Sequence, residues 1–225
     1  MDKLYRRAAA KFLQLPLIVG IFVFLPAGTL DYWQAWLFTG VFVGCSLVIT
    51  AYLAIVDPKL LESRMHAGPG AEKERSQKII VMFALICFAA LPVISALDHR
   101  FGWSHVPPAV VILGNALIVL SYVGFYFVFR ANRYGAATIR VSEGQSVAST
   151  GPYAVVRHPM YSWALLMTAA IPLALGSWWG LLVLVPTIAG LAARLLDEER
   201  FLAKHLSGYA EYMQKVRYRL LPFVW

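Results

Sequence analysis

Five long stretches of this sequence contain no Asp, Glu, Lys or Arg. In chain order they cover residues 12–30, 32–56, 79–97, 106–129 and 159–193. An α-helix needs about 20 mainly apolar residues to cross the roughly 30 Å hydrocarbon core of a bilayer. The composition agrees, with 60% hydrophobic and 14% charged residues, whereas soluble domains have about 45–50% and about 25%. We therefore expect an all-α integral membrane protein.

The last of these stretches is too long for one crossing. As a single straight helix it would reach about 52 Å at 1.5 Å per residue. It is interrupted by Pro172 and by the segment GSWWG at 176–180. Gly and Pro interrupt helices, and Trp favours the membrane interface. We expect a hairpin of two short helices over about 160–176 and 181–196, with the tryptophans at the turn and about six membrane-embedded helices in total.

The basic residues support this division. With six crossings, 19 of the 20 Lys and Arg residues lie on the side of the two termini and of loops 57–78 and 130–158, and Arg100 lies opposite. Because basic loops stay on the cytoplasmic side, both termini and any site beside them are predicted to be cytoplasmic. We expect the inner or plasma membrane of a prokaryote.

The domain organisation follows from the same pattern. We expect one membrane domain over 1–225, with four transmembrane helices in 1–129. Residues 130–225 then hold a cofactor-binding loop, the helical hairpin and a cytoplasmic C-terminal helix. The first apolar run lacks a small-x-small exit before Asp31, so we interpret it as a retained helix and not as a cleavable signal.

The first 105 residues offer little chemistry. Asp31, Asp57 and Asp98 are predicted at helix ends, where a charge near the membrane has the lowest free-energy cost. Loop 57–78 is predicted to be a solvated connection. The chain has no GxGxxG or phosphate-loop motif, and its histidines lack metal-site spacing, so no metal is expected.

Polar residues gather instead at the two ends of the hairpin. Arg157-His158 precedes its first helix, and Arg194 with Glu198-Glu199 closes its second. Both ends are predicted at the same membrane face, so these side chains can meet. Polar groups at the mouth of a helical bundle, walled by aromatic residues, are typical of a ligand site.

Each element also has a plainer interpretation. Arg157-His158 could be a basic membrane anchor, with Pro159 merely beginning a helix. Arg194 and Glu198 could form an i, i+4 surface ion pair. Four tyrosines could belong to an interfacial belt: Tyr153, Tyr161, Tyr209 and Tyr212. The convergence of all these groups on one end of the hairpin favours the ligand site.

Several motifs carry a family resemblance. The segments GPY (151–153), RHPMY (157–161), EE (198–199) and LPF (221–223) occur in this order. In these features the part from about 130 to the end resembles the isoprenylcysteine carboxyl methyltransferase family, whose wider group includes phospholipid N-methyltransferases.

The resemblance implies S-adenosyl-L-methionine as the methyl donor. It places the cofactor-binding residues at Gln145, Ser146, Val147, Ala148, Tyr153, His158, Pro159, Met160, Tyr161, Glu198 and Glu199. The family's substrate-orienting arginine lies four residues before Glu198, which makes Arg194 the catalytic candidate. Many members have Gly soon after the RHPxY tyrosine; here Ser162-Trp163 follow, which predicts a bulkier wall beside the cofactor.

The residue types suit this chemistry. A carboxylate such as Glu198 can hold the donor's ammonium or ribose hydroxyls, and aromatic faces attract a sulfonium. An ionised acceptor needs alignment and not a strong base. The planar guanidinium of Arg194 could hold an acceptor carboxylate at two points.

The acceptor is less constrained than the donor. A carboxylate of isoprenylcysteine type fits Arg194 best, and a phospholipid amine or a small thiol are alternatives. We expect a lipophilic small-molecule or lipid substrate, contact with membrane lipids and no nucleic-acid partner. A transporter or a non-enzymatic membrane protein is a remote alternative. Transporters favour broken helices and polar residues at mid-membrane, whereas here the central thirds of the first four predicted helices are mainly apolar and the polar residues gather at the membrane edge.

Overall fold

The computed structural model describes residues 2–72, 74–134 and 144–225. Within them the chain forms helices and no strand. The α-helices are α1 (Asp2–Ala27), α2 (Trp33–Val56), α3 (Pro58–Met65), α4 (Arg75–Phe101), α5 (Pro108–Ala131), α6 (Pro159–Ala174), α7 (Leu184–His205) and α8 (Tyr209–Lys215). Short 3-10 turns cover Pro69–Ala71, Gly151–Ala154 and Trp179–Val183.

The expected membrane fold is confirmed. Among the described residues, five helices are long and apolar enough to cross a bilayer, namely α1, α2, α4, α5 and the helix that runs through α7, and α6 is a shorter apolar helix. Their outer faces expose large apolar side chains, such as Leu13 and Leu25 at 74% and Ile55 at 82%. Exposed apolar surface on this scale fits contact with lipid and not with water.

The last two membrane helices form the predicted hairpin. The helix α6 begins at Pro159, whose ring suits a first helical position. It ends at Ala174, and the exposed Trp178 and Trp179 occupy the turn before α7. The hairpin thus brings residues 157–161 and 194–199 to one end of the bundle.

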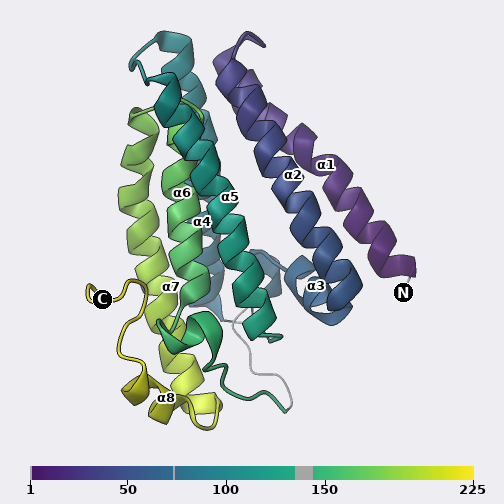
Figure 1. Cartoon of the computed structure of the whole chain (residues 1–225), viewed down its shortest axis with the longest axis vertical. Coiled ribbons are helices and arrows are strands. Elements are labelled where there is room, and N and C mark those ends of the chain that lie inside the picture. The colour runs from purple at the N-terminus through teal and green to yellow at the C-terminus, as the bar shows by residue number, and fades with distance from the viewer. Residues whose placement is uncertain (1, 73, 135–143) are drawn as a thin grey trace.

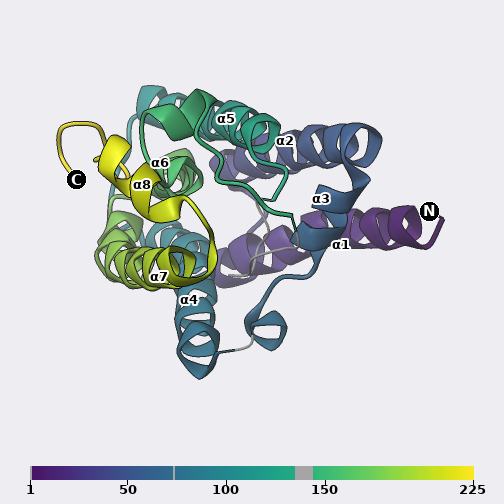
Figure 2. The ribbon, with the colours of Figure 1, turned by 90° about the horizontal axis from the view of Figure 1, so that it is seen from below.

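The bundle has two parts. Seen from one end, α4, α5, α6 and α7 form a compact group, and α1 and α2 lie to one side of it (Figure 2). The closest packing joins α5 to α6, where two glycines of α5 remove the side chains that would collide. A Cβ on Gly114 would meet the backbone of Leu173 and Ala174, and one on Gly124 would meet the ring of Trp163.

A buried polar cluster holds the end of the bundle that carries the hairpin turn. Asp98 is fully buried, and its carboxylate accepts hydrogen bonds from the hydroxyls of Ser104 (2.5 Å) and Ser177 (2.6 Å). The backbone N–H of Trp178 donates to the Ser104 hydroxyl (3.2 Å). Asp98 lies in the last turn of α4, as expected, and its carboxylate joins α4 to the loop before α5 and to the hairpin turn.

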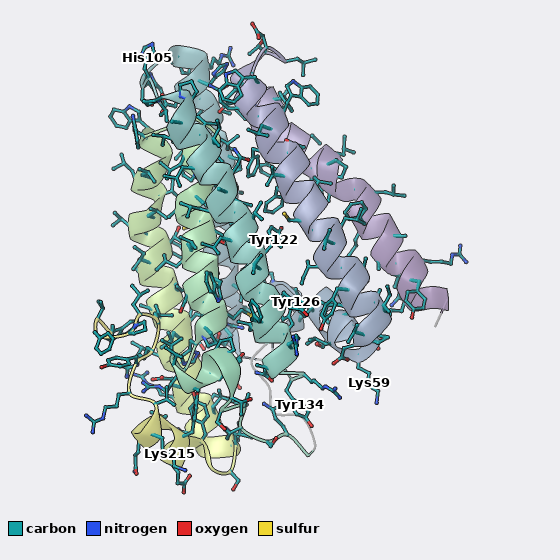
Figure 3. All side chains as sticks on the ribbon, in the orientation of Figure 1. Lys59, His105, Tyr122, Tyr126, Tyr134 and Lys215 are labelled. Atoms are coloured by element: carbon teal, nitrogen blue, oxygen red, sulfur yellow. The ribbon has the colours of Figure 1, made fainter. Side chains whose placement is uncertain are left out.

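The opposite end carries α3 and α8, and both termini lie toward it (Figure 1). Figure 3 shows this separation by side chain, with His105 at one end of the molecule and Lys59 and Lys215 at the other. Loop 57–78 is more structured than the expected solvated connection. The Asp57 carboxylate caps α3 by accepting from the Leu60 N–H (3.0 Å), and Leu60 and Leu61 are buried.

Candidate functional site

A second polar cluster lies at the opposite end of the bundle from Asp98, and its centre is the buried carboxylate of Glu199 on α7. This group is called the polar cluster below. The Oε1 atom of Glu199 accepts a hydrogen bond from Nε of Arg157 (2.6 Å) and lies 3.3 Å from Nε2 of His158. Its Oε2 accepts from Nε of Arg219 (3.0 Å). Arg157, His158 and Glu199 are all buried, with at most 6% of each residue exposed. The two ends of the hairpin therefore meet, as the sequence predicts.

This cluster also fixes the C-terminal segment. Arg157 donates from one guanidinium nitrogen to the carbonyls of Val216 (2.8 Å) and Arg217 (2.9 Å). The backbone N–H groups of Arg157 and His158 donate to the carbonyls of Tyr218 and Arg219, each at 2.9 Å. A buried guanidinium that binds a buried carboxylate and two backbone carbonyls is not a membrane anchor, so that interpretation of Arg157 is wrong.

The neighbouring carboxylate, Glu198, has different partners. The Tyr161 hydroxyl donates to its Oε2 at 2.5 Å. The same phenol lies within hydrogen-bonding reach of Arg194. The ring of Tyr161 also stacks on that of His158, with centroids 5.6 Å apart. Tyr161 therefore connects His158, Glu198 and Arg194 at one edge of the bundle.

Arg194 pairs with residues far away in the sequence. One guanidinium nitrogen donates to the carboxylate of Glu72 (2.6 Å) and the other to the side-chain carbonyl of Gln77. Both partners are buried, at 5% and 2% exposure. The expected alternative of a surface ion pair with Glu198 is wrong, because Arg194 is buried and Glu72 takes that place. The region before residue 105 thus contributes to the site.

The loop that the resemblance assigns to the cofactor lies beside this cluster. Val147 packs against the buried group of Leu206, Tyr209 and Tyr212. Ala148 packs against a second buried group, which contains Tyr153. Gln145 and Ser146, the other two residues of the predicted set, directly precede them and are partly buried and exposed, respectively.

Tyr153 holds the loop in place. Its hydroxyl accepts a hydrogen bond from the side-chain amide of Asn132 (3.1 Å), and its carbonyl accepts from the Tyr212 hydroxyl (2.7 Å). Burial raises the pKa of Tyr153 to about 12, although the bond from Asn132 acts in the opposite direction. Tyr153 and Tyr212 are both buried, so neither serves in an interfacial belt.

Two further observations concern residues around the RHPxY segment. The side chain of Trp163 lies against Gly124 of α5 and packs into the core, so its bulk is accommodated by that glycine. Met160 contacts Arg64 of α3, whose guanidinium nitrogen lies 3.5 Å from the methionine sulfur. Within the described residues, no group of three or more His, Cys, Asp or Glu side chains could hold a metal ion.

Sequence reasoning missed Arg64, Glu72 and Gln77. They lie 80 or more residues before the RHPxY segment, in a loop and at two helix ends that carry no recognisable motif. The available signal was indirect: Glu72, Glu74 and Gln77 lie among basic residues next to an apolar helix.

The fold and the polar cluster define an all-helical integral membrane protein with a charged site at one end of its bundle. Residues 109–208 match the model of a family described as phospholipid methyltransferase. This match includes the candidate residues 145–161 and 194–199, and it supports a membrane methyltransferase function.

A second similarity extends over a longer part of the chain. The sequence is 26% identical over 156 residues to the Delta(14)-sterol reductase of Mus musculus. The similar region covers 61% of this chain and 37% of the reductase, so the chain spans much less than two thirds of that protein's length.

Proposed function

We propose that this protein is an S-adenosylmethionine-dependent methyltransferase that acts on a lipophilic acceptor at the cytoplasmic edge of the membrane. The observation that supports it most is that the phospholipid methyltransferase match coincides with the polar cluster. Loop 145–148, the segment 157–161 and Glu198 lie together inside the matched region.

The polar groups present suit the proposed cofactor. Within the described residues, the hydroxyl of Tyr209 is buried without a hydrogen-bond partner, and Glu198 and Glu199 are close enough to influence it electrostatically. Also among the described residues, the side-chain nitrogen of Gln77 is buried without a partner, while its oxygen accepts a hydrogen bond from Arg194. Buried polar groups normally have partners, so these atoms favour a polar ligand at this place.

The cofactor supplies an activated methyl group on a cationic sulfonium. Glu198 would bind the ammonium or the ribose hydroxyls of the cofactor through charge-assisted hydrogen bonds. The Tyr161 hydroxyl donates to one of its oxygens and so fixes the orientation of the carboxylate. His158 and Tyr161 would present stacked rings toward the sulfonium. We assign Glu199 to positioning: both its oxygens already bind cations, and it orients His158.

Arg194 is the proposed acceptor-orienting residue. Glu72 and Gln77 fix its guanidinium plane, and Tyr161 links it to the proposed cofactor residues. A carboxylate, a thiolate or an unprotonated amine can attack a methyl group without a strong base, so alignment is the contribution required of the protein. We propose a carboxylate of isoprenylcysteine type as the first acceptor and a phospholipid amine as the second, since the matched family's description names phospholipids.

The similarity to a sterol reductase supports a second candidate function. In that case the same end of the bundle would bind a hydride donor, and the Tyr161–Glu198 pair would deliver a proton to a carbon–carbon double bond. A reductase needs a nicotinamide or similar cofactor, which separates the two candidates experimentally.

The experiment is transfer of a labelled methyl group. Purified protein in lipid nanodiscs, with methyl-labelled S-adenosylmethionine, should label a chloroform-extractable pool when given prenylcysteine or phosphatidylethanolamine. Alkali-labile label identifies a methyl ester, and alkali-stable label identifies an N-methyl product. Loss of a double bond in a sterol acceptor with NADPH, and no methyl transfer, would favour the reductase.

A further inference from the structure

A cavity of about 420 Å³ lies between α1, α2, α3 and α5. Most of its wall is apolar, with Phe12, Leu15, Ile49, Leu53 and Phe125 among the lining residues. Its volume falls in the range of about 300–1,000 Å³ that is usual for small-molecule sites. In Figure 1, α1 and α2 diverge from α5 toward the end that carries α3.

The cavity has one strongly positive end. Arg64 and Lys11 both line it, and Lys11 donates to the carbonyl of Met65 (2.9 Å). Among the described lining residues no side chain is acidic. Farther along, the hydroxyls of Ser46 and Tyr122 satisfy each other at 2.6 Å. Figure 3 shows Tyr122 and Tyr126 on the side of α5 that faces α2.

Arg64 connects this cavity to the proposed cofactor site. Its guanidinium lies over the ring of Phe129, 4.6 Å from the centroid, and contacts the sulfur of Met160 at 3.5 Å. Met160 belongs to the proposed cofactor-binding set and is adjacent to Tyr161. A negatively charged group held by Arg64 would therefore lie beside the segment that is proposed to bind the methyl donor.

The cavity and Arg194 differ in their surroundings. The guanidinium of Arg194 is engaged by Glu72 and Gln77, and Arg194 does not line this cavity. The cavity has the guanidinium of Arg64 at one end of an apolar volume that lies between helices. This combination matches an amphiphile with an anionic headgroup and an apolar chain, because a cation attracts the headgroup while the chain leaves water.

We propose that this cavity binds the methyl acceptor, an amphiphile with a carboxylate or phosphate headgroup, and that Arg64 determines its specificity. Arg64 and Lys11 attract the headgroup to this end of the cavity, and the chain lies between α1, α2 and α5. Arg64 contacts Met160 and Arg194 bonds to the adjacent Tyr161, so Arg194 keeps its proposed role of orienting the reacting atom of the same acceptor. The role as acceptor rests on the proposed methyltransferase function, but the binding itself requires no methyl transfer.

The test is photo-crosslinking with palmitic acid that carries a diazirine in mid-chain. The full-length protein is used in phosphatidylcholine nanodiscs, and the labelled peptides are identified by mass spectrometry. Labels should concentrate on the cavity-facing parts of α1, α2 and α5. Excess oleic acid should prevent labelling, and oleyl alcohol, which has the chain without the charge, should not.

Three variants locate the headgroup and the chain. Arg64→Gln should lower the specific labelling about tenfold, the loss that corresponds to one hydrogen bond to a charged group. Arg130→Gln is the matched control, because Arg130 is an exposed arginine on α5 outside the cavity, and it should label normally. Thr50→Trp should block labelling by filling the cavity with all charges retained. Melting temperatures equal to that of the wild type would show that the variants are folded.

Competition with lysophosphatidate distinguishes the two headgroup sources. Competition equal to that of oleic acid supports a phosphate headgroup, and weaker competition supports a carboxylate. Labelling spread evenly over the lipid-facing helices, or unchanged in folded Arg64→Gln, would overturn the proposal. If the wild type fails to bind S-adenosylmethionine but keeps this labelling pattern, the methyltransferase function fails and the anionic amphiphile site stands.

Discussion

The guanidinium of Arg194 on α7 binds the carboxylate of Glu72 at 2.6 Å, across 122 positions of the sequence. This pair joins the segment before α4 to the last membrane helix at the end where the RHPxY residues gather. Together with the bond to Gln77, this pair fixes the plane of the Arg194 guanidinium beside Tyr161. The proposed role of Arg194 in orienting the acceptor depends on that fixed guanidinium plane.

Arg194→Lys should lower turnover by about 100-fold, because a misplaced orienting group can cost that much. Lysine keeps the charge but cannot bind Glu72, Gln77 and an acceptor with one planar fork. Affinity for S-adenosylmethionine should stay nearly unchanged. The measurement is steady-state methyl transfer with calorimetry on the same samples, and Arg200→Lys, at an exposed position of α7, is the control. Full activity in Arg194→Ala would eliminate the orienting role and favour an amine acceptor.

Glu198→Gln should weaken S-adenosylmethionine binding by about 1.5–3 kcal/mol, the range for a hydrogen bond to a charged group. Asp197→Asn is the matched control: the same chemical change occurs one residue earlier, with the side chain directed about 100° away around the helix. Isothermal titration calorimetry measures both. Equal affinity in the two variants would remove Glu198 from the site.

Glu199→Gln should destabilise the folded protein by about 3–5 kcal/mol, because removing one partner leaves buried cations uncompensated. The affected cations are Arg157 and the partly buried Arg219. Thermal unfolding in detergent tests this, with the exposed Glu211→Gln as the control. A melting temperature that stays at the wild-type value would show that Glu199 is not needed to hold the C-terminal segment.

Gly124→Ala should destabilise the bundle by about 1–3 kcal/mol, the usual cost of overpacking. The added Cβ would collide with the ring of Trp163 at the α5–α6 contact. Gly44→Ala is the control, since a Cβ there meets nothing within 4 Å. Thermal unfolding again provides the measurement, and equal stability of the two variants would contradict the close α5–α6 packing.

Reporter fusions should place residues 102 and 178 outside the cell and residue 225 inside. The structure supports grouping the first two, because Trp178 bonds to Ser104 at the end of the bundle opposite α8 (Figure 1). The direction follows from the basic residues, 19 of which are predicted on one side. An external residue 225 would contradict both the proposed cytoplasmic site and the positive-inside assignment.

The sequence alone predicted the helices and the meeting of the two hairpin ends at the candidate site. Uncharged stretches of membrane length predicted the spans, and Trp178-Trp179 with the flanking glycines predicted the hairpin turn. The helices proved longer than the uncharged stretches: α4 begins at Arg75 and ends at Phe101. Charged residues near helix ends can stay helical because their side chains reach the membrane surface.

The other half of the site could not be predicted, because its contacts are tertiary. Nothing local to Glu72 indicates that it will be buried against Arg194, and Arg64 has the appearance of one more basic loop residue. Trp163 shows the same limit, since its place against Gly124 depends on how α5 packs on α6. Hydrophobic pattern fixes which face a helix buries, and the pairing of distant polar residues follows only from the packed bundle.

Calorimetric titration of the purified, full-length protein with S-adenosylmethionine, and in parallel with NADPH, tests the central claim most directly. The methyltransferase account predicts saturable binding of S-adenosylmethionine that weakens in Glu198→Gln and persists in Asp197→Asn, with no saturable binding of NADPH. Saturable binding of NADPH without binding of S-adenosylmethionine would contradict this account and favour a reductase.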